Sequence, residues 1–313
     1  MLMSLALVLE QPERLKLTTL PLDEPTAADV LVETRWTGVS AGTERLLYTG
    51  RMPPFPGMGY PLVPGYETVG DVISAGPEAG IAVGARVFVP GARCFGEVRG
   101  LHGGTASRLV APGARVVPFK SELGERGVMF ALAATALHAL KVASPDDSML
   151  IVGHGALGRL LARLAIVRGL PAPIVWEKNP ERSCGPVGYL VTTPQADERR
   201  SYKTIVDCSG DAGGIDALIQ RLALGGAIVL AGFYDTVSFA FASAFMREAS
   251  FRIAAQWAPG DLAEVVGLVE SGSLSLDELI THRRPAAEAA EAYPIAFEDP
   301  SCIKMVLDWS SLR

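Results

Sequence analysis

The sequence predicts an α/β protein that begins with a domain of short antiparallel strands and continues as a doubly wound parallel sheet. Up to about residue 118 the chain is rich in glycine, proline and β-branched residues, and turn signals separate short apolar runs. From about residue 120, apolar runs of strand length alternate with helical patterns. A glycine-rich turn joins one of these strands to the next helix, which is the arrangement of a nucleotide-binding sheet.

Composition narrows the class of protein. The 313 residues are enough for two domains, and 49% hydrophobic with 20% charged residues is typical of a packed core. The net charge of −6 repels phosphate backbones, so we expect no nucleic-acid partner. The richest apolar run, Val128–Leu140, is too short to span a bilayer and indicates a buried helix, so we expect no integral membrane segment. Four cysteines lie far apart, which fits a reducing cytosol and argues against a four-cysteine zinc site.

In the first domain, runs such as Val30–Val32 and Arg86–Val89 are typical of strands. Turn signals separate them, among them Gly76-Pro77, Gly103-Gly104 and Pro112-Gly113. Short strands at this spacing predict an antiparallel barrel or sandwich.

The second half alternates helices with buried strands. The predicted helices are Leu123–Val142 and Ala156–Val167, and the predicted strands are Met149–Val152, Pro173–Trp176, Thr204–Val206 and Ala227–Leu230. Strands separated by helices require crossover connections, which predicts a mainly parallel sheet covered on both faces. An amphipathic helix follows at Asp261–Glu270, and the strand-like tail Cys302–Leu307 offers a return to the first domain.

The segment from Gly153 to Gly158 reads G-H-G-A-L-G, a G-x-G-x-x-G pattern that follows a strand and opens a helix. In this context Gly153 permits the tight turn, Gly155 lets the backbone approach a pyrophosphate, and Gly158 allows close packing of helix on strand. The pattern predicts a dinucleotide site in a Rossmann-type sheet.

The residues between these glycines face the same site. Ala156 and Leu157 open the helix, where unpaired N–H groups and the positive dipole end favour phosphates. We expect the His154 side chain to face solvent or the phosphates.

Glu177 closes the next predicted strand, about 20 residues beyond the last glycine of the pattern. A carboxylate there accepts hydrogen bonds from the ribose hydroxyls and repels a 2′-phosphate, so the sequence favours NAD over NADP. Lys178 would meet such a phosphate if the Glu177 side chain turned away.

Small residues end two further strands of the predicted sheet. Ser209 follows one strand and Gly232 the next, and small residues at the carboxyl ends of parallel strands leave room for a ligand. Phe233 and Tyr234 either line the nicotinamide pocket or cap the sheet.

Several segments resemble the medium-chain dehydrogenase/reductase family. They are Asp29–Ser40, Pro64–Val72, Val83–Val87, Gly103–Ala106, Ile280–Arg283 and Lys304–Leu307. The resemblance covers nearly the whole chain. It implies a GroES-like antiparallel β-barrel catalytic domain over residues 1–119 and 257–313, and a Rossmann NAD-binding domain over residues 120–256.

Three further segments resemble a group within that family, the bacteriochlorophyllide a dehydrogenases of bacteriochlorophyll biosynthesis. They are Gly42–Leu47, Gly50–Pro61 and Pro90–Glu97. This resemblance implies NAD-dependent oxidation of the hydroxyethyl side chain of a (bacterio)chlorophyllide to an acetyl group, with a tetrapyrrole as the substrate.

The sequence departs from the zinc-dependent members of the family at two positions. Where those members carry cysteine and histidine ligands, this chain has Ser40 and Tyr66. A hydroxyl and a phenol are poor zinc ligands beside thiolate and imidazole, so we expect no catalytic and no structural zinc. The segment Glu177–Leu190 is also short for a full helix and strand, so we expect that part of the sheet to be abbreviated.

Without a metal, a positioned side chain must move the proton of the alcohol. Tyr66 and Ser40 stand where the resemblance puts the lost ligands, and Thr43 and Glu67 are their neighbours in sequence. The hypothesis is that Tyr66, with Ser40 or Thr43, orients and deprotonates the alcohol, and that Glu67 completes a relay. The alternative is that Tyr66 is a packed aromatic residue that fills the vacated metal site.

The loop from Arg51 to Tyr60 combines prolines, aromatic residues, methionines and one cation. We predict that Phe55, Met58 and Tyr60 stack against the flat tetrapyrrole and that Arg51 pairs with a propionate. The alternative is a surface loop stiffened by its prolines.

Two other functions stay open from the sequence. A zinc-free enone or quinone reductase shares the expected fold, although such enzymes usually prefer NADPH, which Glu177 disfavours. A non-catalytic dinucleotide-binding protein would bind the cofactor and turn over no alcohol. Family habit also favours a homodimer joined through the sheet edge of the Rossmann domain.

Overall fold

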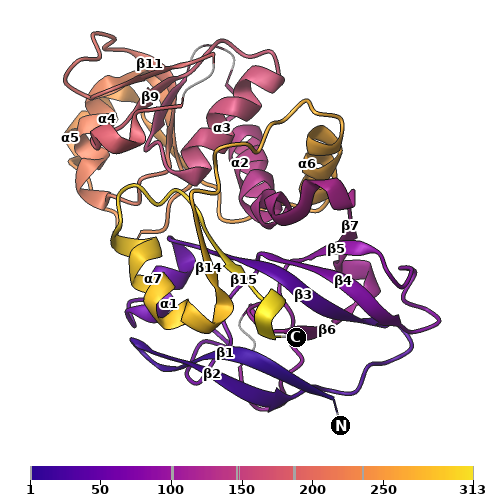
Figure 1. Ribbon diagram of the computed structural model, residues 1–313. Coiled ribbons are helices and arrows are strands. Elements are labelled where there is room, and N and C mark those ends of the chain that lie inside the picture. The colour runs from indigo at the N-terminus through magenta and orange to yellow at the C-terminus, as the bar shows by residue number, and fades with distance from the viewer. Residues whose placement is uncertain are drawn as a thin grey trace. The chain divides into compact units, whose positions relative to one another are not determined.

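The computed structural model describes residues 2–99, 102–145, 147, 149–185, 188–234 and 236–312. The chain forms two compact units (Figure 1). Unit 1 comprises Met1–Ala131 and Leu279–Arg313, and unit 2 comprises Leu132–Glu278. The α/β class with its two kinds of sheet is confirmed.

Unit 1 is built around the long strand β3 (Asp29–Val39). Its seven-stranded sheet has the order β14-β15-β3-β4-β5-β7, and β6 also pairs with β3. Among the described strands of this sheet, only the pair β14–β15 is parallel. The other strands of this sheet are β4 (Thr68–Ala75), β5 (Arg86–Val89), β6 (Arg108–Pro112), β7 (Val117–Pro118), β14 (His282–Pro285) and β15 (Met305–Asp308). Strands β1 (Met3–Gln11) and β2 (Arg14–Pro21) form a separate two-stranded antiparallel sheet.

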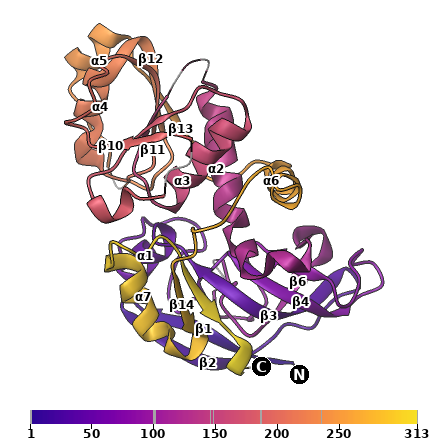
Figure 2. The ribbon, with the colours of Figure 1, turned by 45° about the horizontal axis from the view of Figure 1, so that its top comes forward.

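The C-terminal tail completes unit 1. Strand β15 pairs antiparallel with β3, and the two lie side by side in Figures 1 and 2. The buried Trp309 donates its indole N–H to Thr37 Oγ1 at 3.0 Å. The expected return of the tail to the first domain is therefore confirmed. Short helices of this unit are α1 (Thr43–Tyr48), η1 (Gly113–Arg115), η2 (Ser121–Met129), η5 (Ala286–Glu288), α7 (Ala289–Glu298) and η6 (Ser310–Leu312).

Unit 2 contains a six-stranded sheet whose recorded pairs are all parallel. Its order is β10-β9-β8-β11-β12-β13, which is the 3-2-1-4-5-6 order of a dinucleotide-binding sheet. Successive strands are added to one side of β8 up to β10 and to its other side from β11 onward, so the ligand crevice of this topology lies at the carboxyl ends of β8 and β11. The strands are β8 (Leu150–Val152), β9 (Ile174–Trp176), β10 (Leu190–Thr192), β11 (Tyr202–Asp207), β12 (Leu222–Leu230) and β13 (Ser250–Ile253).

Helices cover both faces of this sheet. In Figures 1 and 2, α4 and α5 lie on one face, and α2 and α3 lie on the other. The helices are α2 (Phe130–Ala143), α3 (Ala156–Val167), η3 (Pro180–Arg182), η4 (Ala212–Gly214), α4 (Ile215–Arg221), α5 (Phe241–Arg247) and α6 (Asp261–Glu270). The stretch Ser121–Ala143 is long and apolar enough to cross a membrane, but 67% of its most apolar window is buried inside the protein.

Two crossovers of the sheet are abbreviated. Among the described residues 177–185 and 188–189, the single turn η3 is the only helical element between β9 and β10, and no helix is described between β10 and β11. A buried carboxylate holds the second crossover, because Asp197 Oδ2 accepts hydrogen bonds from Trp176 Nε1 and Tyr202 OH, both at 2.8 Å. The expected shortening after Glu177 is confirmed.

The two compact units divide the chain at other residues than the predicted domains, whose bounds stay a prediction. The predicted divisions followed residues 119 and 256, whereas the structure divides after Ala131 and Glu278. Segment η2 belongs with unit 1, where a Cβ on Gly127 would lie 2.6 Å from Phe119. Helix α6 belongs with unit 2, where Lys141 Nζ lies 2.7 Å from Asp261 Oδ1.

Candidate active site

Three of the predicted catalytic residues meet in unit 1. Tyr66 lies in the loop before β4, Ser40 follows β3, and Thr43 opens α1. The Tyr66 hydroxyl shares hydrogen bonds with Ser40 Oγ at 2.7 Å and with Thr43 Oγ1 at 3.3 Å. The ring of the half-buried His102 packs against the Tyr66 ring in an edge-to-face arrangement, with 5.0 Å between ring centroids.

The surroundings of Tyr66 keep it protonated. Burial raises the pKa of the Tyr66 phenol above its ordinary value, and the neighbouring Glu67 carboxyl adds to the rise. At neutral pH the group is therefore a hydroxyl, which can donate one hydrogen bond while it accepts another.

Glu67 lies beside this group but faces another partner. Its side chain is fully buried, and Lys304 Nζ donates to both carboxylate oxygens at 2.9 and 2.7 Å. The same ammonium group donates to Val39 O at 3.2 Å. Burial raises the pKa of Glu67, and Lys304 opposes the shift. A Cβ on Gly38 would lie 2.2 Å from Glu67 Oε2, so only glycine fits at that point of β3.

A second buried carboxyl, that of Glu44, holds the backbone of Ser40 in place. Glu44 Oε1 accepts the backbone N–H of Ser40 at 3.1 Å, and the backbone N–H of Glu44 donates to Ser40 O at 3.0 Å. Tyr293 OH donates to Glu44 Oε2, and both side chains are buried. Burial raises the pKa of Glu44 to about 7, although the hydrogen bonds from Tyr293 and Ser40 oppose the rise.

Sequence reasoning missed Lys304, Glu44 and Tyr293. Lys304 is the one charged residue in the tail Cys302–Leu307, and a lone lysine in a strand-like run is a signal for a buried partner. No local pattern marks the Glu44–Tyr293 pair, whose members lie 249 residues apart.

The predicted substrate loop is partly held by the core of unit 1. Arg51 is exposed and Phe55 is 40% exposed. Met58 and Tyr60 pack against the core cluster of Leu9, Leu47, Met52 and Leu62. The Tyr60 hydroxyl donates to Leu47 O, so Arg51 and Phe55 are the predicted residues most open to a ligand.

The glycine pattern of unit 2 has the structure that a dinucleotide site needs. Gly153 has a φ of +94°, and a Cβ on Gly158 would lie 1.9 Å from Gly153 O. Nothing lies within 4 Å of the position of a Cβ on Gly155, so the space in front of α3 is open. Ala156 and Leu157 form the first turn of α3, as predicted.

Glu177 follows β9 and is fixed by two backbone groups. Its Oε2 accepts the N–H of His154 at 2.9 Å, and its Oε1 accepts the N–H of Asn179 at 2.8 Å. Each carboxylate oxygen keeps a free lone pair for a further donor. Lys178 Nζ lies 3.4 Å from Asp211 Oδ2, in an exposed ion pair.

The other predicted cofactor residues gather around the end of β11. Ser209 Oγ donates to Asp207 Oδ1 at 2.6 Å, and Gly232 N donates to Asp207 O at 3.1 Å. The Phe233 side chain is 47% exposed, so it does not close the sheet, whereas Tyr234 OH donates to Asp207 O at 3.2 Å.

The expectation for His154 is wrong. The side chain is fully buried and faces the chain that follows Glu177, where Nδ1 bonds to Arg182 O at 2.6 Å and Nε2 to Tyr189 OH at 2.8 Å. These bonds tie the imidazole to two described positions of the shortened crossover, Arg182 and Tyr189.

Within the part of the chain that the structure describes, no group of three or more histidine, cysteine, aspartate or glutamate side chains is placed to hold a metal ion. The absence of zinc stays a prediction.

Residues 26–121 match the family described as "Alcohol dehydrogenase GroES-like domain". The chain is 54% identical to the 2-desacetyl-2-hydroxyethyl bacteriochlorophyllide A dehydrogenase of Rhodobacter capsulatus over 310 residues, which cover 98% of both chains. The enzyme of the same name from Cereibacter sphaeroides is also 54% identical over 310 residues, which cover 97% of this chain and 98% of its own.

Solved structures share the fold at low identity. A short chain alcohol dehydrogenase from Escherichia coli CFT073, complexed with NADH, superposes with a TM-score of 0.82 at 19% identity and covers 98% of this chain and 99% of its own. A zinc-binding dehydrogenase from Sinorhizobium meliloti 1021, bound to NADP, has a TM-score of 0.80 at 21% identity and covers 98% and 100%. Dehydrogenases of this fold therefore bind either nicotinamide dinucleotide.

The raised pKa of Glu44 predicts a pH dependence of stability. The folded protein holds the Glu44 proton up to about pH 7, whereas the unfolded chain loses it near pH 4.5, so this group lowers the stability as pH rises between those values. We expect Glu44→Gln, which stays neutral, to gain about 5 °C in melting temperature over the wild type between pH 5 and pH 8.

Thermal unfolding followed by circular dichroism at several pH values measures this difference. Glu78→Gln, which removes an exposed carboxyl, is the control and should follow the wild type. A difference between Glu44→Gln and the wild type that does not change with pH would contradict the prediction.

Proposed function

The chain belongs to the 2-desacetyl-2-hydroxyethyl bacteriochlorophyllide A dehydrogenase family, and we propose that it oxidises its alcohol substrate with NAD and without zinc. It is an alcohol dehydrogenase of bacteriochlorophyll biosynthesis, which converts the hydroxyethyl side chain of a (bacterio)chlorophyllide to an acetyl group. The observation that carries this function is the 54% identity over 98% of the chain.

The residues of unit 2 fit a bound dinucleotide. The open approach at Gly155 and the turn at Gly153 suit a pyrophosphate in front of α3. The carboxylate of Glu177 can still accept hydrogen bonds from ribose hydroxyls. The nearby Asp211 forms an ion pair with Lys178, the cation that would otherwise attract a 2′-phosphate. Two carboxylates disfavour a 2′-phosphate, which supports NAD over NADP. When bound, the nicotinamide supplies the acceptor for the hydride.

Tyr66, Ser40 and Thr43 carry the proton in this proposal. The Tyr66 oxygen accepts the hydrogen bond of the substrate alcohol while its own O–H donates to Ser40 Oγ or Thr43 Oγ1. Because the pKa of Tyr66 is raised, the group does not store the proton as a phenolate. As the Tyr66 oxygen takes the alcohol proton, its own hydroxyl proton passes to Ser40 Oγ or Thr43 Oγ1, and the half-buried Thr43 releases its hydroxyl proton to solvent water. Glu67 and Lys304 position the loop that carries Tyr66.

The proposal that the site works without a metal depends on the side chains of Ser40 and Tyr66. Ser40 and Tyr66 are hydrogen-bonded to each other, and neither side chain is a ligand type that zinc prefers. Their hydroxyl groups hold the alcohol in place of a Lewis acid.

The substrate is a tetrapyrrole with an acidic side chain. Arg51 is exposed and supplies the cation for a propionate, and Phe55 offers a ring face to the macrocycle. Met58 adds a thioether, while Tyr60 shapes the loop through its bond to Leu47 O.

The direct experiment mixes the protein, NAD and hydroxyethyl bacteriochlorophyllide, and follows NADH formation together with the absorption shift of the pigment. We expect both signals with NAD and neither with NADP, no loss with a chelator, and less than stoichiometric zinc by elemental analysis. Absence of both signals would remove the proposed substrate, and one zinc per chain would remove the metal-free mechanism.

Tyr66→Phe removes the hydroxyl that holds the alcohol and leaves the ring. We expect kcat to fall by about 100-fold, the scale of a lost general acid–base group. The affinity for NAD, measured by titration calorimetry, should not change. Tyr48→Phe, in the aromatic cluster with Tyr293, is the control for loss of a phenol elsewhere in unit 1. Wild-type turnover with an unchanged pH profile in Tyr66→Phe would make Tyr66 a packing residue only.

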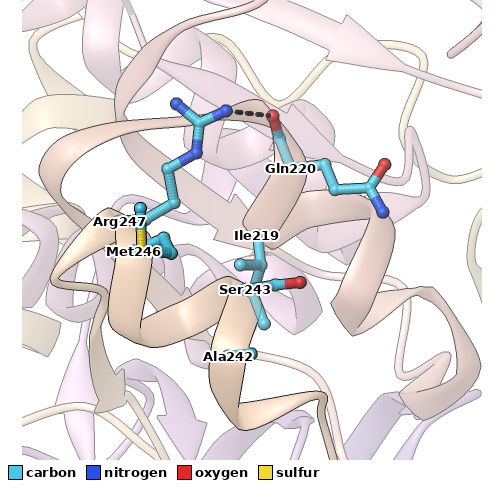
Figure 3. Close-up of a pocket in the computed structure, with 6 residues that line it drawn as sticks. All are labelled: Ile219, Gln220, Ala242, Ser243, Met246 and Arg247. Atoms are coloured by element: carbon cyan, nitrogen blue, oxygen red, sulfur yellow. Dashed lines mark hydrogen bonds between the residues drawn. The ribbon is translucent and has the colours of Figure 1, made fainter.

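We further propose that the protein is a homodimer joined through α5 and β13 of unit 2. Strand β13 pairs only with β12 among the described strands, so its other edge is open. Exposed apolar side chains lie on both elements. On α5, Phe241 is 74% exposed, Phe245 66% and Met246 73%, and on β13, Ile253 is 74% exposed. Hollows of about 350 and 480 Å³ flank α5. In the first of them, Arg247 bonds to Gln220 O (Figure 3).

Phe245→Asp places a charge at the centre of this surface. We expect the dimer to dissociate at least about tenfold more readily, because a buried unpaired carboxylate opposes association. Sedimentation equilibrium measures the change, and Val83→Asp, at a residue of unit 1 that is 63% exposed, is the control. A wild-type protein that sediments as a monomer would exclude the homodimer.

A further inference from the structure

The chain that follows Glu177 is held by side chains of the glycine loop and of α3, in place of a crossover helix. Arg182 O accepts two donors, Nδ1 of His154 at 2.6 Å and Nη2 of Arg159 at 2.9 Å. Arg159 is buried as well, and its Nε donates to His154 O at 3.1 Å. One cluster therefore ties the phosphate-binding turn to the segment after β9.

The imidazole of His154 is bonded at both ends. Since a carbonyl oxygen only accepts, Nδ1 carries the hydrogen and donates to Arg182 O, and Nε2 accepts the hydrogen of Tyr189 OH. The Tyr189 ring packs edge-on against it, with 5.6 Å between ring centroids.

Burial keeps this arrangement in one protonation state. It lowers the pKa of His154 to about 4, with Arg159 and Arg163 adding to the drop while Glu177 and the bond to Arg182 O oppose it. The imidazole is neutral at the pH at which the protein works, so the direction of both hydrogen bonds is fixed.

Glu177 depends on this cluster for its position. One carboxylate oxygen is bonded to the N–H of His154 and the other to the N–H of Asn179, which begins the segment that His154 holds. Movement of either backbone group shifts the carboxylate. Hydrogen bonds weaken steeply with distance and angle, so a small shift decides whether a ribose hydroxyl is recognised.

We propose that His154 is the positioning residue that aims Glu177 at the adenosine ribose and thereby makes the site selective for a dinucleotide with a free 2′-hydroxyl. This inference rests on the proposed NAD dependence. His154 touches no reacting atom, so it acts on cofactor affinity and selectivity and not on the chemical step.

The test compares NAD with its analogue that lacks the 2′-hydroxyl of the adenosine ribose, by titration calorimetry at fixed salt. We expect the wild type to bind NAD about tenfold more tightly than the analogue, the scale of one hydrogen bond to a charged group. In His154→Ala the Kd of NAD should rise about tenfold and the preference over the analogue should vanish. The kcat at saturating NAD should stay at the wild-type value.

Two further variants are expected to weaken the preference for NAD over the analogue less than His154→Ala does. His154→Asn keeps a donor near the Nδ1 position and should restore part of the preference, and Tyr189→Phe removes only the hydroxyl that Nε2 accepts from. Cys184→Ser is the matched control, because this exposed side chain lies in the same segment and donates to Glu181 O, outside the His154 cluster. Should His154→Ala fail to unfold cooperatively, Tyr189→Phe serves in its place, with a weaker preference for NAD as the supporting result.

Failure of the inference and failure of the cofactor proposal give different results. A wild type that binds NADP more tightly than NAD overturns the cofactor proposal, whatever the variants do. A wild type that prefers NAD, together with variants that keep the full preference over the analogue, overturns only the role of His154.

Discussion

The buried ion pair between Glu67 and Lys304 is the contact on which unit 1 depends. It joins residues 237 positions apart and adds a bond from Lys304 to Val39 O at the end of β3. Loss of one member of such a pair leaves an uncompensated buried charge, at a cost of about 3–5 kcal/mol. The pair therefore obliges the C-terminal strand, the end of β3 and the loop of Tyr66 to stay together, and it explains why Gly38 carries no side chain.

Around that pair, polar groups are arranged in two layers. The hydroxyls of Tyr66, Ser40 and Thr43 form the layer that is suited to an alcohol. Behind them, the Glu44 carboxyl fixes the backbone of Ser40 and accepts the hydroxyl of Tyr293. Because the inner layer is dry, its hydrogen bonds are strong and its members have defined positions, which is the condition for proton transfer through hydroxyls.

Unit 2 shows the same use of buried polar groups for another purpose. Among the residues that the structure describes, the β9–β10 crossover contains only the single turn η3 and the β10–β11 crossover no helix, and single side chains hold these shortened connections. Asp197 accepts hydrogen bonds from the side chains of Trp176 and Tyr202. The His154 ring forms hydrogen bonds with both Arg182 O and Tyr189 OH. Each arrangement supplies hydrogen-bond partners to buried polar groups of a connection that a helix would otherwise form. The sheet therefore keeps its strand order with shorter connections between the strands.

The sequence by itself determined the features that local pattern controls. The parallel strands, the glycine turn before α3, the place of Glu177 and the shortened crossover follow from periodicity and from spacing within a few tens of residues. Only the tertiary structure decided the unit boundaries, the partner of Glu67, the buried face of His154 and the Glu44–Tyr293 pair. These contacts join residues that lie far apart in the chain or in the shortened crossover after Glu177. Burial changes the pKa values and hydrogen bonds of these side chains only after the fold has brought them together.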